Sequence, residues 1–207
     1  MHLPDGIIPL EQEIIYYIIS LIILTLYFYK FSKNDNKEKQ IVLIAIFAVF
    51  TFVLSSLSVP SPLGVPIHFF LIPLVVILLG YVTGTIVAFI SLLGQVLFLN
   101  MGGITSFGAN FIVMGFIIAL VTHVFYSIFE DINEKLAILV STVMGIICAT
   151  LGQILILLWT GTIGLELLLS TLIPYYFIIS IIEAIANIII ISSVKEVKPE
   201  IMDIEKI

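Results

Sequence analysis

Residues 136–159 read LAILVSTVMGIICATLGQILILLW, which is 24 residues in a row without one charged side chain. A helix needs about 20 apolar residues to cross the hydrocarbon core of a membrane, so this stretch predicts a transmembrane helix. The whole chain has the same character, because 61% of its 207 residues are hydrophobic, 11% are charged and the mean hydropathy is +1.27. A soluble domain of this length cannot bury so much apolar surface. We therefore predict an all-α integral membrane protein.

Six further apolar stretches predict helices of the same kind. They run from Ile14 to Phe31, Ile41 to Val59, Ile67 to Val82, Thr85 to Leu99, Ala109 to Phe129 and Leu167 to Val194. The third and fourth stretches along the chain are short for a full crossing, and we interpret Gly80–Gly84 as a tight turn between them. Because no polar linker divides the chain, residues 1–207 are predicted to form a single transmembrane domain of about seven helices.

The positive charges predict how these helices are oriented. All eight basic residues are lysines. They follow the first stretch, separate the fifth from the sixth, or follow the seventh, at Lys30, Lys33, Lys37, Lys39, Lys135, Lys195, Lys198 and Lys206. Seven crossings bring these three segments to one side of the membrane, which the positive-inside rule makes cytoplasmic. We therefore expect residues 195–207 to form a cytoplasmic tail and the N-terminus to lie outside.

The acidic residues near the N-terminus argue against a cleaved secretory signal. Asp5, Glu11 and Glu13 stand where such a signal carries positive charge, so we expect Met1 to be retained. The net charge of −6 argues against a nucleic-acid partner. The single cysteine, Cys148, lies in an apolar stretch and is interpreted as a small buried side chain.

Met1 and His2 predict half of a metal site within residues 1–13. The terminal amine, the His2 backbone amide and the His2 imidazole lie on one short segment and can hold a divalent cation in fused chelate rings. The topology brings His68 to the same outer side, so that its imidazole can supply a fourth nitrogen. His123 lies deep in the fifth predicted helix, towards the cytoplasmic end, and is interpreted as a structural residue.

A planar set of four nitrogens predicts which metals fit. It favours Ni(II) or Cu(II), and low-spin Co(II) also accepts it, whereas Zn(II) prefers a tetrahedral set. Mg(II) and Ca(II) prefer oxygen ligands and do not promote loss of an amide proton. Neighbouring groups must orient the two imidazoles, and Thr105, Ser106 and Asn110 of the glycine-rich outer loop are our candidates. A second outer loop, residues 58–68, is expected to be rigid because it contains three prolines.

Three motifs carry a resemblance to a known family. The opening Met1-His2-Leu3-Pro4-Asp5-Gly6 resembles Met-His-Ile-Pro-Asp-Gly, and Gly64–His68 stands where the family has Gly-Thr-Ser-Gly-His. Gly102–Thr105 and Gly108–Asn110 resemble Gly-Gly-Leu-Thr and Gly-Ala-Asn. Over most of its length the chain therefore resembles the substrate-binding membrane subunit of cobalt and nickel energy-coupling-factor transporters.

This resemblance implies a function. The N-terminal segment would fold back into the helical bundle, where Met1, His2 and His68 would hold Ni(II) or Co(II) as the transported substrate, without an organic cofactor. The subunit would lie in a prokaryotic plasma membrane and would not hydrolyse ATP. Its partners would be a transmembrane coupling subunit, cytoplasmic ATPase subunits and a small additional membrane subunit. Two departures, Val65-Pro66-Ile67 and Met101, could alter the metal preference or abolish metal binding.

Other functions remain open from the sequence. The chain has no Gly-x-x-x-x-Gly-Lys-Ser/Thr phosphate loop, so we expect no ATPase activity of that type. Glu183, the one acidic residue in the middle of a predicted helix, is either functional or bonded to Asn187 one turn away. The alternatives to metal capture are a vitamin-binding subunit of the same transporter class, a stand-alone permease and an intramembrane enzyme.

Overall fold

The computed structural model describes residues 1–34, 37–57, 68–161 and 163–197, and every regular element in these ranges is a helix. Six helices are long and apolar enough to cross a membrane. They are α1 (Leu10–Ser32), α2 (Lys37–Ser56), α4 (Tyr81–Leu99), the continuous helix built from α5 (Phe107–Asn110), η1 (Phe111–Ile117) and α6 (Ile118–Phe129), then α7 (Glu134–Thr160) and α8 (Leu165–Val197). The predicted all-α membrane fold is confirmed.

The third predicted helix along the chain is much shorter than expected. Instead of a helix over residues 67–82, α3 (Ile72–Leu79) has eight residues, and residues 68–71 before it are not helical. All eight residues of α3 are buried, because the helix packs against α4 and α6. Non-helical backbone is tolerated at membrane depth only where protein covers it, and this segment meets that condition.

A single glycine makes the turn between α3 and α4. Gly80 has a φ of 86°, a value that favours glycine, and α4 begins at the next residue. The predicted five-residue turn Gly80–Gly84 is therefore wrong, since Gly84 lies inside α4. A Cβ atom on Gly84 would stand 2.5 Å from Cγ2 of Val76. This glycine thus allows α4 to pack closely against α3.

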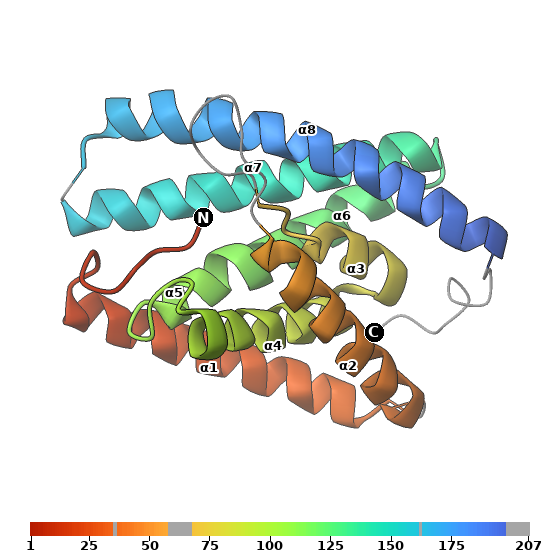
Figure 1. The fold of residues 1–207 in the computed structure, drawn as a ribbon, viewed down its shortest axis with the longest axis horizontal. Helices are drawn as coiled ribbons and strands as arrows, with labels where there is room; N and C mark the ends of the chain where they lie inside the picture. Colours follow the sequence, from red (N-terminus) through yellow and green to blue (C-terminus); the bar gives the residue numbers. More distant parts are fainter. Residues whose placement is uncertain (35–36, 58–67, 162, 198–207) are drawn as a thin grey trace.

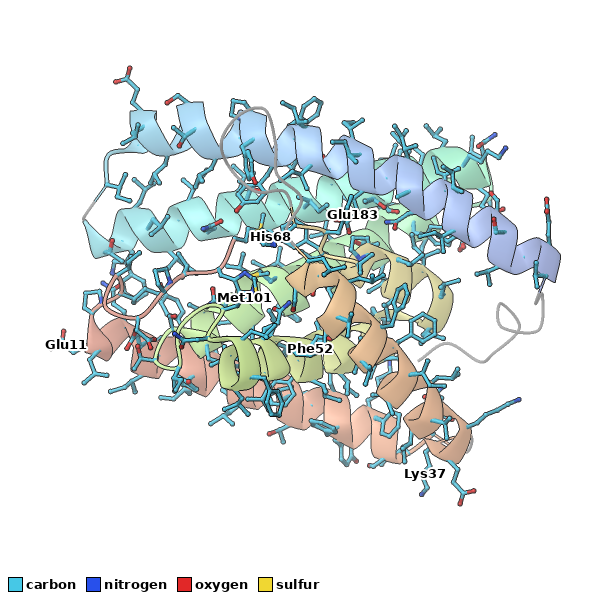
Figure 2. The ribbon with its side chains drawn as sticks, in the orientation of Figure 1. Glu11, Lys37, Phe52, His68, Met101 and Glu183 are labelled. Atoms are coloured by element: carbon cyan, nitrogen blue, oxygen red, sulfur yellow. The ribbon has the colours of Figure 1, made fainter. Side chains whose placement is uncertain are left out.

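The long helices lie side by side and define two ends of the bundle (Figure 1). The N-terminal segment, the connection between α4 and α5, and the turn between α7 and α8 lie at one end. At the other end an ion pair between Lys195 and Glu134 joins α8 to α7, and Lys30 donates a hydrogen bond to the Tyr81 hydroxyl. Lys37 and Glu11 lie at opposite ends (Figure 2). The described lysines therefore share one end, which the positive-inside rule makes cytoplasmic.

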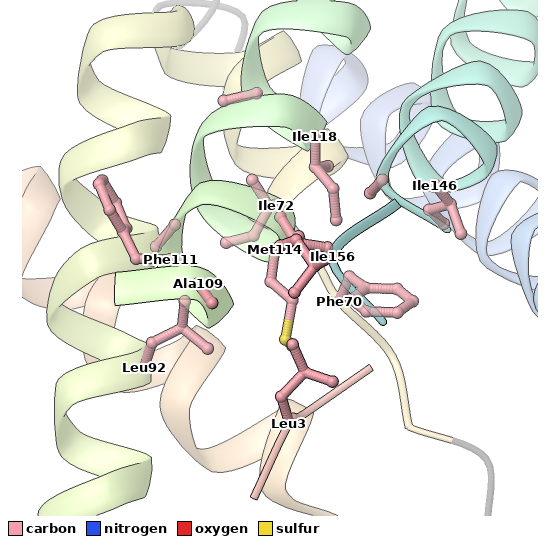
Figure 3. Close-up of a cluster of buried hydrophobic side chains, with 14 of the residues drawn as sticks. Leu3, Phe70, Ile72, Leu92, Ala109, Phe111, Met114, Ile118, Ile146 and Ile156 are labelled. Carbon is pink, nitrogen blue, oxygen red and sulfur yellow. The ribbon is translucent and has the colours of Figure 1, made fainter. Parts of the chain in front are cut away.

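The N-terminal segment, residues 1–9, folds into the protein rather than away from it. Leu3 and Ile8 are each only 3% exposed. Leu3 joins a buried cluster that includes Phe70 before α3 and Met114 in η1 (Figure 3). The expectation that the N-terminus tucks into the bundle is confirmed.

Two residues interpreted as structural lie away from this segment. His123 in α6 stacks on Tyr81 at the lysine end, with ring centroids 4.6 Å apart. Cys148 in α7 is a free, half-buried cysteine. The proline-rich part of the outer loop and the departure Val65-Pro66-Ile67 lie outside the described residues.

Candidate metal centre

The three predicted metal ligands line one cavity. Met1, His2 and His68 meet between the N-terminal segment, α4 and α8, around an open space of about 40 Å³. This space suits a single ion, whereas pockets for organic ligands of drug size span about 300–1,000 Å³. Among the described residues no three His, Cys, Asp or Glu side chains are grouped to hold a metal. A metal ion in this cavity would need donors beyond the two imidazoles, and the Met1 amine is among the groups that line it.

Gln95 in α4 sets the tautomer of His2. Its side-chain oxygen lies 3.0 Å from Nε2 of His2, and its side-chain nitrogen donates to the Ser55 hydroxyl at 2.7 Å. Because the amide oxygen faces the imidazole, Nε2 carries the proton and Nδ1 keeps its lone pair. Nδ1 is the ring nitrogen that can close a six-membered chelate ring with the His2 backbone nitrogen. Gln95 is not among the residues predicted from the sequence, although a glutamine within an apolar stretch is a signal for such a role.

The Met1 amine lies in the protein interior and donates a hydrogen bond to the Tyr176 hydroxyl of α8. Burial lowers the pKa of this amine to about 5. Burial also lowers the pKa of His2 to about 4, helped by the nearby amine charge and opposed by the bond to Gln95. Both groups are therefore neutral at pH 7, and this is the form that binds a metal. Tyr176, one of eight tyrosines, carried no signal in the sequence.

His68 presents an unpartnered nitrogen at the same cavity. Its Nδ1 is buried and has no hydrogen-bond partner among the described residues. Burial and the charge of the Met1 amine lower its pKa, while a hydrogen bond to the Ser55 backbone raises it. A buried polar atom without a partner is costly in a folded protein, so this nitrogen is available to a ligand.

Asn110 and Ser106 hold the backbone of the residue that follows His2. The Asn110 side chain accepts from the Leu3 amide at 2.7 Å and donates to the Leu3 carbonyl at 2.9 Å. The Ser106 hydroxyl and the Gly103 amide donate to the same carbonyl. These two predicted residues therefore fix the path of the N-terminal segment, while the imidazole itself is bonded to Gln95.

Thr105 bonds to Asp5, which lies three residues beyond His2. Its amide and its hydroxyl both donate to Oδ1 of Asp5 at 2.8 Å, and the Ile104 amide donates to Oδ2 at 3.1 Å. The Thr105 hydroxyl also bonds to Glu13 at 2.7 Å. Burial would raise the pKa of the Asp5 carboxyl, but the bonds from Thr105, Ser106 and Ile104 outweigh it and lower that pKa. The carboxylate thus stays charged and clamps the segment to the loop.

Two glycines let the glycine-rich outer loop, residues 100–106 between α4 and α5, approach the N-terminal segment. A Cβ atom on Gly103 would stand 1.9 Å from Oδ1 and 2.5 Å from the backbone nitrogen of Asp5. Gly102 has a φ of 81°, and a Cβ there would lie 3.2 Å from Cδ2 of His2. Met101 precedes them, and its amide bonds to the Gln95 carbonyl at 3.1 Å. The close contact between this loop and the N-terminal segment therefore requires glycine at both positions.

The comparisons with known proteins describe transport components. Residues 2–201 match the sequence family "Cobalt uptake substrate-specific transmembrane region". The chain is 32% identical to the "Cobalt transport protein CbiM" of Thermosipho melanesiensis over 146 residues, which is 70% of this chain and 62% of that protein. It is 39% identical to the "Putative cobalt transport protein CbiM" of Methanococcus voltae over 141 residues, 67% of this chain and 61% of that protein. These alignments span less than two thirds of either relative.

Two further matches extend over nearly the whole chain. A "Putative cobalt transport protein CbiM" of Archaeoglobus fulgidus is 26% identical over 216 residues and is covered completely, as is this chain. A solved structure described as "Crystal Structure of an Truncated Transition metal Transporter" has a TM-score of 0.85 at 25% identity, and the superposition covers 95% of this chain and 99% of that one. The sequence family and the superposed structure are thus both described as metal-transport proteins.

Proposed function

This chain belongs to the family of cobalt uptake substrate-specific transmembrane regions, and we propose that it captures Ni(II) or Co(II) through Met1, His2 and His68. It is a multi-pass membrane protein, and its relatives are transport components rather than enzymes. One observation carries the proposal. A buried amine and two imidazoles, whose pKa values are all lowered, face one cavity of about 40 Å³.

The proposed ligands explain why a transition-metal ion would bind in preference to Mg(II) or Ca(II). The Met1 amine, the His2 amide nitrogen and His2 Nδ1 supply three nitrogens in fused rings, and Nδ1 of His68 supplies the fourth. Such a set favours Ni(II), Cu(II) and low-spin Co(II) over cations that require oxygen ligands, and the family description, which names cobalt, supports Co(II) and the chemically similar Ni(II) among them. The small cavity also disfavours the vitamin-binding alternative.

We further propose that this chain is the substrate-specificity subunit of an energy-coupling-factor importer. It would take the cation from the outer side and depend on a transmembrane coupling subunit and cytoplasmic ATPase subunits for energy. A small additional membrane subunit would complete the assembly. The family description, a substrate-specific transmembrane region of cobalt uptake, supports the part of this proposal in which the chain selects the cation.

The proposal is tested by calorimetric titration of the purified protein with Ni(II) and Co(II). A two-residue extension before Met1 converts the amine into an amide and should abolish binding. His68→Ala should weaken binding by more than the roughly 10- to 100-fold that follows loss of a group outside the ligand set. His123→Ala, which removes the histidine at the lysine end, is the matched control and should leave the affinity unchanged. Unchanged binding by the extended protein would contradict the proposal.

A further inference from the structure

Glu183 in α8 is a fully buried carboxyl group that bonds to the segment carrying His68. Its two oxygens accept the backbone N–H groups of Phe70 and Leu71, each at 2.8 Å. Its neighbour Asn187 donates to the Thr142 hydroxyl in α7, so a contact between Glu183 and Asn187, one of the two alternatives that the sequence left open, is not the one that forms. In the described part of the chain the only ion pair joins Lys195 to Glu134, so backbone amides take the place of a cation.

The segment between His68 and α3 needs such a partner. Residues 68–71 are non-helical, and Leu71 adopts a left-handed φ of 61° that is uncommon for a side chain of its kind. Their amides therefore lack helical partners in a region without bulk water, where an unpaired amide is costly. The N-terminus of α3 also carries a partial positive charge, which a carboxylate complements. Glu183 thus satisfies both the amides and the helix end.

The same face of α8 holds the other half of the metal centre. Tyr176 precedes Glu183 by seven residues, or two helical turns, and accepts the hydrogen bond of the Met1 amine. Its ring also packs against Phe70, with centroids 6.1 Å apart. Glu183 and His68 lie near each other in the interior of the bundle (Figure 2). α8 therefore contacts both the segment that carries the amine and the segment that carries the second imidazole.

We propose that Glu183 is a positioning residue for metal capture. By holding the Phe70 and Leu71 amides, it fixes the backbone two residues beyond His68 and aims Nδ1 of that imidazole at the ion bound by Met1 and His2. Glu183 does not touch the metal. This role rests on the proposed function, because it requires that His68 is a ligand.

Glu183→Gln is the direct test, because a glutamine of nearly the same shape has one acceptor oxygen and can hold only one of the two amides. We expect the Ni(II) affinity to fall about 10- to 100-fold, the range typical of groups that orient metal ligands. The visible absorption of the Ni(II) complex should also shift, because the fourth nitrogen is lost or displaced. Asn187→Ala, one turn away and bonded to Thr142, is the matched control and should keep both affinity and spectrum.

A double-mutant cycle with His68→Ala separates positioning from other roles. If Glu183 acts through His68, adding Glu183→Gln to His68→Ala should weaken Ni(II) binding less than twofold further. An equal loss in both backgrounds would overturn the inference, because it would mean that the carboxylate attracts the cation directly. Failure of the wild-type protein to bind Ni(II) would instead refute the proposed function. Wild-type affinity in Glu183→Gln would refute the positioning role alone.

Thermal unfolding without metal provides a check on folding. If Glu183→Gln does not fold, Glu183→Asp is the second variant, since it keeps the charge and shortens the side chain by one methylene group. We expect Glu183→Asp to fold and to bind Ni(II) with an affinity between those of the wild type and His68→Ala. Binding as tight as that of the wild type would overturn the inference, because the shorter side chain cannot reach both amides from the same backbone.

Discussion

The N-terminal segment and the 68–71 segment both bring nitrogen atoms to the cavity that we propose as the metal site, yet they are held in different ways. Side chains and backbone amides of the outer loop and of α5 form hydrogen bonds to the N-terminal segment at Leu3 and at Asp5. In the second, the two amides next to α3 both bond to the carboxylate of Glu183. Redundant bonds make the first segment tolerant of single losses, whereas the second depends on one side chain.

The difference has a physical origin in the lengths of the two segments. The N-terminal segment has nine non-helical residues and the 68–71 segment has four, so more backbone freedom must be lost to fix the first in one geometry. Several hydrogen bonds to a packed loop offset that entropy cost. Residues 68–71 continue directly into the buried helix α3, so a single bidentate acceptor is sufficient there.

The largest loss of Ni(II) affinity is expected from a substitution that pushes the N-terminal segment away from the outer loop. In Gly103→Ala the new methyl group would overlap the Asp5 carboxylate and backbone nitrogen. Overpacking costs about 1–3 kcal/mol, so we expect the Ni(II) affinity to fall by up to about 100-fold. Gly164→Ala is the control, because no atom lies within 4 Å of its Cβ position. Calorimetry that finds equal affinity for both variants would show that the close contact is not needed.

Removing the partner of the His2 ring tests a contact of the first segment that, like the bond of the Met1 amine to Tyr176, has no duplicate. Gln95→Leu deletes the acceptor of Nε2 and leaves the tautomer free, so we expect about 10- to 100-fold weaker Ni(II) binding. Gln95→Glu keeps an acceptor at this position and should bind far more tightly than Gln95→Leu. If both variants bind alike in a calorimetric titration, Gln95 does not orient the ring.

The pH dependence of binding shows whether the first segment is preorganised. With pKa values of about 5 for the Met1 amine and about 4 for His2, both groups are already neutral above pH 6. Only the His2 amide proton is then released on binding, so affinity should rise about tenfold per pH unit between pH 6 and 8. A free peptide with the same first residues has an amine pKa near 8 and should show a steeper rise. A slope of two or more for the protein would show that the amine is charged in the folded state.

The smallest effect should follow loss of a duplicated bond. Asn110→Ala removes two hydrogen bonds to Leu3, but Ser106 and Gly103 still hold the Leu3 carbonyl. We expect a loss of about 1–2 kcal/mol, or roughly tenfold in Ni(II) affinity measured by calorimetry. A loss larger than that caused by Glu183→Gln would reverse the ranking of the two segments.

Particular residues show how far the sequence could predict the site. His2 and His68 were placed together because the helix count and the lysines assign both to one side, and they do line one cavity. Thr105, Ser106 and Asn110 are predicted from the sequence to orient the imidazoles, and in the structure they bond instead to Leu3 and Asp5 of the N-terminal segment. Gln95 lies 93 positions from His2 along the chain, and no local pattern reports such a pairing.

Helical membrane architecture, the gathering of lysines at one end and the nitrogen-rich start of the chain could all be determined from the sequence by itself. Each depends on composition, on periodicity or on atoms that are covalently close. The short helix α3, the ring orientation of His2 and the bonding of Glu183 were decided only by the tertiary structure. They depend on which distant groups meet inside the bundle, where each buried polar atom must find a partner.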